Sequence, residues 1–181
     1  MATTPSTSKV ITGKVRLSYV NVFDVNDKGK YSVAILIPKS DKATIDKIKA
    51  AVESVKTEAK SAQVWGSKFL ASFKTPLRDG DTDRDVEKNP EYKGHYFVNC
   101  NSGQKPGVVD AALNPIMDKS EVYSGCYARV SVNFYPFNVD GNKGIAAGLN
   151  NVQKLAEGDP LSGRSRAEDD FTAVDDDDFL S

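Results

Sequence analysis

The feature that most constrains the fold is an alternation of apolar and polar residues over 126–137, CYARVSVNFYPF. One face carries Cys126, Ala128, Val130, Val132 and Phe134, and the other carries Tyr127, Arg129, Ser131, Asn133 and Tyr135. A period of two predicts a β-strand that buries one face and exposes the other. The chain therefore needs a sheet, and the outer face of this strand displays two tyrosines around an arginine.

Further strands are predicted at 9–23, 31–37, 94–101 and 145–152. In the first of these, Val15, Leu17 and Tyr19 are expected on the inner face because they alternate with polar residues. Segments rich in Asp, Asn and Gly at 24–30 and 138–144 predict turns that connect neighbouring strands as hairpins.

One amphipathic helix is predicted after Ser40 or Asp41, either of which can cap it, because apolar residues recur at spacings of three and four from Ile45 to Ala62. The segment 63–93 has no clear period, which indicates either a functional loop insertion or secondary structure that the pattern misses. The expected fold is mainly β with one helix. Closure into a small barrel or a sandwich is favoured because open sheet edges promote aggregation.

Charge is divided unequally along the chain, although the net charge is only −1. Residues 168–181 hold seven acidic residues and no basic one, which leaves the rest of the chain at +6 and this segment at −7. An acidic block repels itself and stays solvated, so we expect a disordered acidic tail. At its end, acidic residues lead to a terminal apolar hook, which suits a protein partner. The candidate partner-binding residues are Asp175, Asp176, Asp177, Asp178, Phe179 and Leu180.

The chain is expected to be cytoplasmic. The longest apolar run, 33–37, is far shorter than the ~20 residues that span a bilayer. Residues 1–9 contain no apolar stretch typical of a secretory signal. Two cysteines, Cys100 and Cys126, are too few for a disulfide framework and are interpreted as free thiols.

Catalytic motifs are scarce, and no cofactor is expected. A single histidine excludes two-histidine zinc motifs. The acidic run Asp79–Asp85 fails as an EF-hand, because Arg84 and Pro90 stand where that loop needs Gly and Glu. The run is interpreted as a tight turn in which Asp side chains bind backbone N–H groups. A metal-dependent nuclease using Asp79, Asp81, Asp83 and Asp85 is the alternative.

Single-stranded nucleic acid fits the residues better, because binders of single strands combine basic grooves with aromatic rings on which bases stack. The tyrosines around Arg129 form the candidate platform, extended by His95 and Phe97. Trp65 is expected either in the rim or in the core. The candidate nucleic-acid contacts are Lys14, Arg16, Trp65, Lys68, Arg78, Tyr92, Lys93, His95, Phe97, Lys105, Tyr127, Arg129 and Tyr135. A protein-only adaptor that acts through its tail is a further alternative.

A set of ordered motifs resembles a family of phage-encoded single-stranded DNA-binding proteins. The motifs are IPKSDKATIDKI at 37–48, PLRDGD at 76–81, GHYFVNCNS at 94–102, KPGVVD at 105–110, YSGCYARVSVNFYPF at 123–137 and GNKGIAAGLNNVQKL at 141–155. The resemblance implies an OB-fold that binds single strands with little sequence preference during phage replication or recombination.

The resemblance also implies that the acidic tail recruits replication or recombination proteins. We expect a flexible N-terminus at 1–9, an OB-fold-like DNA-binding domain at 10–160, and a linker with the acidic tail at 161–181. A tethered tail of charge −7 is further expected to compete with DNA for the basic domain. The sequence is compatible with either a monomer or a homo-oligomer.

Overall fold

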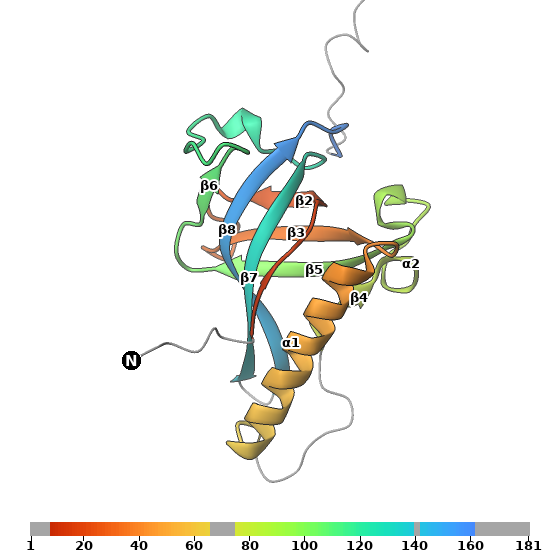
Figure 1. The fold of residues 1–181 in the computed structure, drawn as a ribbon, viewed down its shortest axis with the longest axis vertical. Coiled ribbons are helices and arrows are strands. Elements are labelled where there is room, and N and C mark those ends of the chain that lie inside the picture. Colours follow the sequence, from red (N-terminus) through yellow and green to blue (C-terminus); the bar gives the residue numbers. More distant parts are fainter. Residues whose placement is uncertain (1–7, 66–74, 140–141, 162–181) are drawn as a thin grey trace, which may run out of the picture.

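The computed structural model describes residues 8–65, 75–139 and 142–161, which form a β-barrel with one long helix beside it (Figure 1). The strands are β1 (Lys9–Ile11), β2 (Val15–Asn21), β3 (Tyr31–Pro38), β4 (Arg78–Asp79), β5 (His95–Ser102), β6 (Gly107–Val109), β7 (Tyr127–Val139) and β8 (Asn142–Ala156). The helices are α1 (Lys42–Ser61), α2 (Gly80–Asp83) and the 3-10 turns Pro90–Tyr92 and Lys119–Glu121.

Five strands close the barrel. Antiparallel ladders join β2 to β3, β3 to β5, β8 to β7 and β7 back to β2, and a short parallel ladder joins β5 to β8. The remaining short strands lie at the margins, with β1 on β7, β4 on β5 and β6 on β8. The predicted OB-fold-like barrel is confirmed, and its closure leaves few strand edges exposed.

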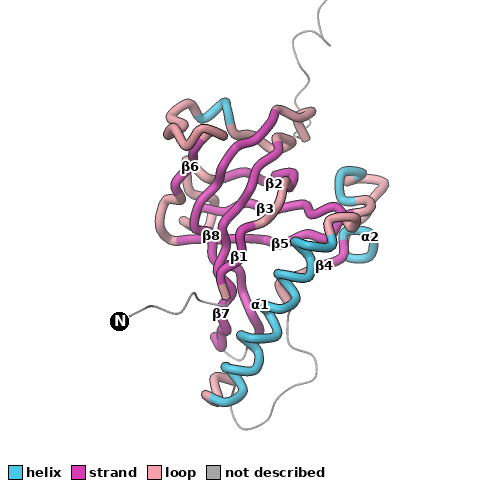
Figure 2. The backbone as a smooth tube through the Cα atoms, viewed as in Figure 1, coloured by secondary structure: helices cyan, strands magenta, loops and turns pink. Residues whose placement is uncertain are grey.

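The strand β7 confirms the alternation predicted over residues 126–137. Ala128, Val130, Val132 and Phe134 are buried in the barrel core, whereas the alternating polar residues face outward. Figure 2 shows that β7 and β8 continue well beyond the barrel, alongside α1. The sequence pattern predicts only the central part of this long hairpin, because the expected return strand covers 145–152 whereas β8 runs from Asn142 to Ala156.

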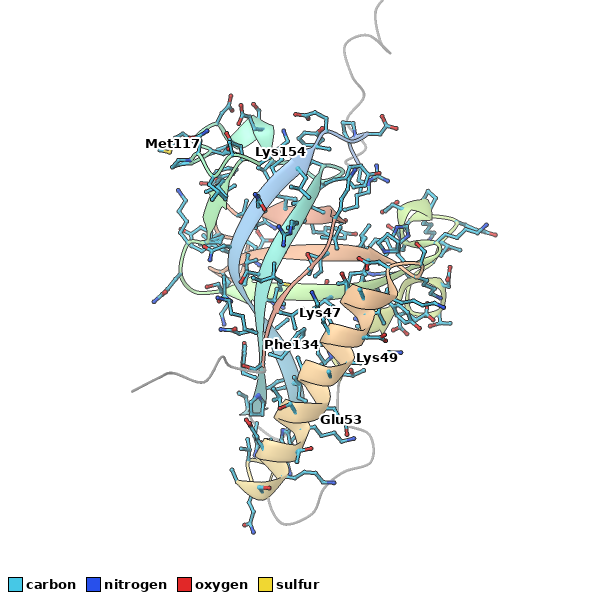
Figure 3. The ribbon with its side chains drawn as sticks, viewed as in Figure 1. Lys47, Lys49, Glu53, Met117, Phe134 and Lys154 are labelled. Carbon is cyan, nitrogen blue, oxygen red and sulfur yellow. The ribbon has the colours of Figure 1, made fainter. Side chains whose placement is uncertain are left out.

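The helix α1 begins after Asp41, whose side chain accepts a hydrogen bond from the Thr44 backbone N–H. Its buried residues include Ile45, Ile48 and Val55, so the predicted apolar stripe is confirmed. Figure 3 shows Phe134 of β7 beside this helix, which covers the extension of the hairpin.

Trp65 belongs to the core. Only 3% of its surface is exposed, and its indole Nε1 donates a 3.0 Å hydrogen bond to the carbonyl of Phe137. Its own carbonyl accepts a hydrogen bond from Lys143 Nζ at 2.7 Å. Trp65 thus anchors the end of α1 to the β7–β8 hairpin, and its prediction as a nucleic-acid contact is corrected.

The segment that precedes β5 is more ordered than its composition suggests. Its strand β4 pairs with β5, and the chain then turns at α2. Tyr92, further along the segment, packs against Phe97 of β5 with the ring centroids 5.1 Å apart. Together with Leu36, these two rings form a second small cluster on the outer side of the sheet. Tyr92 and Phe97 are fully buried, so their prediction as base-stacking residues is corrected as well.

None of the helices in the described part of the chain has the length and apolarity needed to cross a bilayer.

Candidate nucleic-acid interface

A groove of about 380 Å³ lies on the outer face of β2, β3 and β5. Because Val33 and Ile35 of β3 point into the core, Ser32 and Ala34 point outward. The groove is lined by Tyr19, Ser32, Val33, Ala34, Arg84, Asn99, Cys100 and Asn101, and we call it the β3–β5 groove. On an OB-fold, this face is the one that receives oligonucleotides.

Tyr19 stands at one edge of the β3–β5 groove with 56% of its surface exposed. Its φ of +49° lies in the left-handed region, and the ladder between β2 and β3 shifts register between Ser18 and Asn21. This bulge turns the tyrosine out of the inner face, where strict alternation had placed it, so that expectation is corrected. A strained non-glycine residue of this kind is typical of ligand-binding sites.

Arg84 lies beside Tyr19, held among aromatic rings. Its guanidinium carbon is 5.8 Å from the ring centroid of Tyr19, 5.1 Å from that of Tyr92 and 5.2 Å from that of Phe97. Its Nε is buried without a hydrogen-bond partner, and no ion pair within the described residues involves it. Arg84 therefore retains unused hydrogen-bonding capacity at the mouth of the groove.

Asn99 and Asn101 supply further unused polar groups. Both are exposed on the outward positions of β5, and neither side chain hydrogen-bonds to another described residue. Ser32 differs, because its Oγ accepts hydrogen bonds from the amides of Asn21 at 3.3 Å and Asn26 at 3.1 Å. Its hydroxyl can still donate one bond into the groove.

The polar surface continues around the barrel from β5 to β8. Asn101 pairs with Gly148, and a Cβ at Gly148 would lie 3.4 Å from Cε1 of the Tyr135 ring. The missing side chain at Gly148 thus lets the ring of Tyr135 lie on the sheet, with 44% of the residue exposed. We call the surface from Tyr19 to Tyr135, including the β3–β5 groove, the outer wall.

A second groove of about 470 Å³ follows at the end of the outer wall, and we call it the lysine groove. It is lined mainly by polar side chains, with Lys9 of β1 and Lys105 of the loop before β6 among them. Asn133, which pairs with Lys9 and lines this groove, lies on the same face of β7 as Tyr135. Two cations at the end of a row of amides and tyrosines suit a polyanion.

Tyr127 lies near two predicted cations, Lys14, which immediately precedes β2, and Arg16 of β2. Lys14 Nζ lies 4.8 Å and the Arg16 guanidinium carbon 5.8 Å from the centroid of its ring. Arg16 also donates to the carbonyls of Gly125 at 3.1 Å and Asp159 at 2.7 Å. The three predicted residues do meet, but at the junction of β2 and β7 rather than in the β3–β5 groove.

The other predicted contacts scatter. Arg129 and Lys93 are exposed, and His95 is half-buried with its Nδ1 at 2.7 Å from the Lys93 carbonyl. Arg78 lies over the Phe97 ring and contacts Asp83 at 3.5 Å. Lys68 and the tail residues Asp175, Asp176, Asp177, Asp178, Phe179 and Leu180 lie outside the described residues.

Tyr19 and Arg84 were absent from the predicted site. Alternation assigned Tyr19 to the core, and no local signal announces the bulge that exposes it. Arg84 stands in an acidic run and looked like part of a charged turn. The sequence offers only a weak signal that Arg84 belongs to a binding site. Tyr92 and Phe97 follow it at a distance along the chain, and only the fold brings the three side chains together.

The acidic run forms the predicted turn. Asp79 accepts a hydrogen bond from the Asp81 backbone N–H at 2.9 Å, and Asp81 accepts one from Gly94 at 3.0 Å. Lys39 contacts the carboxylates of Asp79 and Asp81 at 2.9 Å and 2.7 Å, and these bonds lower the pKa of both carboxyls. In the described part of the chain, no group of three or more His, Cys, Asp or Glu could hold a metal ion.

Comparison with known proteins adds a family. The pattern of the family described as "Enterobacter phage Enc34, ssDNA-binding protein" matches residues 8–180. A protein designated p50, from Acyrthosiphon pisum secondary endosymbiont phage 1, is 29% identical over 192 residues, which covers 96% of this chain and 99% of p50.

Solved structures share the fold. The single-stranded DNA-binding protein from bacteriophage Enc34 superposes with a TM-score of 0.74 at 24% identity, covering 90% of this chain and 89% of that one. The same phage protein in complex with ssDNA also gives a TM-score of 0.74, at 23% identity, covering 86% and 90% of the two chains.

Proposed function

The chain belongs to the family of the Enterobacter phage Enc34 single-stranded DNA-binding protein, and from this premise we propose that it coats single strands along its outer wall. It is a phage protein that binds single-stranded DNA, and its family is one of binding proteins, not enzymes. We further propose that it protects single strands during phage replication or recombination in the host cytoplasm. The strand is held by stacking and by phosphate contacts, with little dependence on sequence.

The observation that carries this proposal is the continuity of the outer wall. Two exposed tyrosines, Tyr19 and Tyr135, stand at its ends, and unpaired amides lie between them. Three strand spacings separate Tyr19 from Gly148, on which the Tyr135 ring lies, or roughly 14 Å. Lys9 and Lys105 then provide positive charge where the strand leaves the wall. Aromatic rings with cations beyond them match the chemistry of a flexible polyanion with stacking bases.

A salt titration tests the phosphate contacts. Binding of labelled oligo(dT) is measured at several salt concentrations for the native chain and for the double variant Lys9→Ala/Lys105→Ala. Because each neutralised phosphate contributes about −0.7 to the slope of log affinity against log salt, we expect the slope to become shallower by about 1.4.

The matched control is Lys42→Ala/Lys47→Ala, which removes the same charge from the exposed face of α1. We expect its slope to equal that of the native chain. Equal slopes for both double variants would contradict the placement of phosphates in the lysine groove.

We also propose that the acidic tail competes with DNA for the basic domain and recruits replication or recombination proteins through Phe179 and Leu180. Support comes from the root of the tail. Leu161, the last described residue, packs against the cluster of Leu36, Tyr92 and Phe97, and this cluster also holds Arg84. The tail therefore starts beside the β3–β5 groove, where a tethered segment of charge −7 has a high effective concentration.

Deletion of residues 168–181 tests the competition. We expect tighter binding of oligo(dT) at low salt, with the difference shrinking as salt screens the tail. Unchanged affinity at low salt would exclude the competition while leaving recruitment open to a separate pull-down with the replication proteins.

A further inference from the structure

We propose that the β3–β5 groove takes one nucleobase of the bound strand and reads its Hoogsteen edge, favouring purines. This inference rests on the proposed binding of DNA along the outer wall, and it adds a subsite with a base preference to an otherwise sequence-tolerant surface. Three independent features meet in the groove. They are a strained exposed aromatic residue, an arginine with a buried unpaired Nε, and two neighbouring amides without partners.

The chemistry of the lining favours a base over a phosphate. Lysines are absent from the groove, and the two side chains on its β5 side, Asn99 and Asn101, are neutral. Each amide offers both donors and an acceptor, which suits a base edge better than the purely accepting oxygens of a phosphodiester. The outward residue on β3 between them and Tyr19 is Ala34, whose small and largely buried side chain lines the groove. A volume of about 380 Å³ lies within the range of small-molecule sites.

The position of the rings fixes how the base lies. Tyr19 exposes its ring at the edge of the groove, where it can cover one face of a base. The bulge at Tyr19 holds the ring outward before DNA arrives, so little ordering is required upon binding. Arg84 is likewise held by the rings of Tyr92 and Phe97, with its guanidinium beside Tyr19.

Purines are favoured because Asn and Arg side chains both recognise bases through N7 of a purine ring. Asn binds adenine through N6 and N7, and Arg binds guanine through O6 and N7. The acceptor N7 occurs in both purines and in neither pyrimidine. Asn99 and Asn101 are the reading residues, and Arg84 adds a charged donor at the rim for guanine.

The experiment removes N7 and nothing else. Affinities are measured for oligo(dA) and for the same oligomer made with 7-deaza-adenine, which replaces N7 by a C–H group, with oligo(dT) of equal length as the reference. The native chain is expected to bind oligo(dA) at least about fivefold more tightly than the deaza analogue, the low end expected for a bidentate contact in a solvated groove.

The variant Asn99→Ala/Asn101→Ala is expected to bind oligo(dA) and its deaza analogue equally, so the readout is the ratio of these two affinities and not the affinity for oligo(dT). Both positions are exposed, so we expect the fold to be retained. An unfolding midpoint equal to that of the native chain is the check. Its salt slope is also expected to stay that of the native chain, because no cation is removed. The variant Tyr19→Ala instead weakens all three oligomers alike.

Two outcomes overturn the subsite. If the native chain binds oligo(dA) and the deaza analogue equally, no purine N7 is read. If the discrimination survives in the double asparagine variant, the reading residues lie elsewhere. In both cases retained binding of oligo(dT) leaves the proposed function standing, whereas loss of oligo(dT) binding by the native chain would remove the proposed function itself.

Discussion

Replacement of Tyr135 by Ala tests the outer wall most directly. The ring lies on Gly148, which occupies one of its faces and leaves only the other face for a base. One stack is worth about 1–3 kcal/mol by alanine substitution. Taking about 1.4 kcal/mol for a ring that stays partly solvated, the dissociation constant for oligo(dT) should rise about tenfold. Tyr19→Ala should have a similar effect, and the double variant should weaken binding about a hundredfold, because the two rings share no partner.

The assay is fluorescence anisotropy of labelled oligo(dT) at fixed salt. Tyr135→Phe and Tyr19→Phe keep the rings, so both should bind as the native chain does. Met117→Ala removes an exposed apolar side chain from the loop near β6 and should also leave binding unchanged (Figure 3). Native affinity in both alanine variants would refute stacking along the outer wall.

Three further predictions concern the buried groups and the acidic turn. The fluorescence of Trp65, the sole tryptophan, should stay constant when saturating oligo(dT) is added, because the indole is buried in the core. Strong quenching would contradict this and indicate that Trp65 contacts the DNA. Hydrogen bonds from Lys39 lower the pKa of Asp79 and Asp81 below the ordinary value of 3.8. The contribution of these ion pairs to folding stability is therefore present above about pH 4 and lost as the pH falls through the lowered pKa values. Thermal unfolding between pH 6 and pH 2 should therefore show a smaller acid loss in Asp79→Asn/Asp81→Asn than in the native chain. Burial raises the pKa of the Cys100 thiol to about 12 and also raises that of Cys126, so neither should react with a thiol reagent at pH 8 until denaturant is added.

The sequence predicted those parts of the fold that depend on local periodicity. The alternation in β7 and the stripe of α1 each reflect a face buried along its whole length, so the pattern and the structure agree. Tyr19 shows where this reasoning ends, because one residue of bulge reverses the face of every residue beyond it. No composition rule marks such a bulge before the partner strand is known.

The candidate site was harder to predict for a related reason. Phe97 does face outward on β5, as alternation indicated, yet the segment containing Arg84 and Tyr92 folds over it and buries it. Exposure depends on what covers a face, and here the cover comes from a segment without any period. Tyr135 could be found from sequence because its ring lies beside Gly148 on the neighbouring strand and stays 44% exposed, as alternation predicts.

The chain also crosses itself closely after β8, where Gly158 passes over Gly125. A Cβ at either position would overlap backbone of the other strand of the crossing, and the Tyr123 hydroxyl donates to the Gly158 carbonyl at 2.9 Å and accepts from its N–H at 3.1 Å. Leu161 completes the crossing by donating its backbone N–H to Ser124 at 2.8 Å. These contacts extend the barrel five residues beyond the end of its last strand. A chain shortened to Leu161 keeps every one of these bonds, whereas a chain shortened to Ala156 loses both hydrogen bonds between Tyr123 and Gly158.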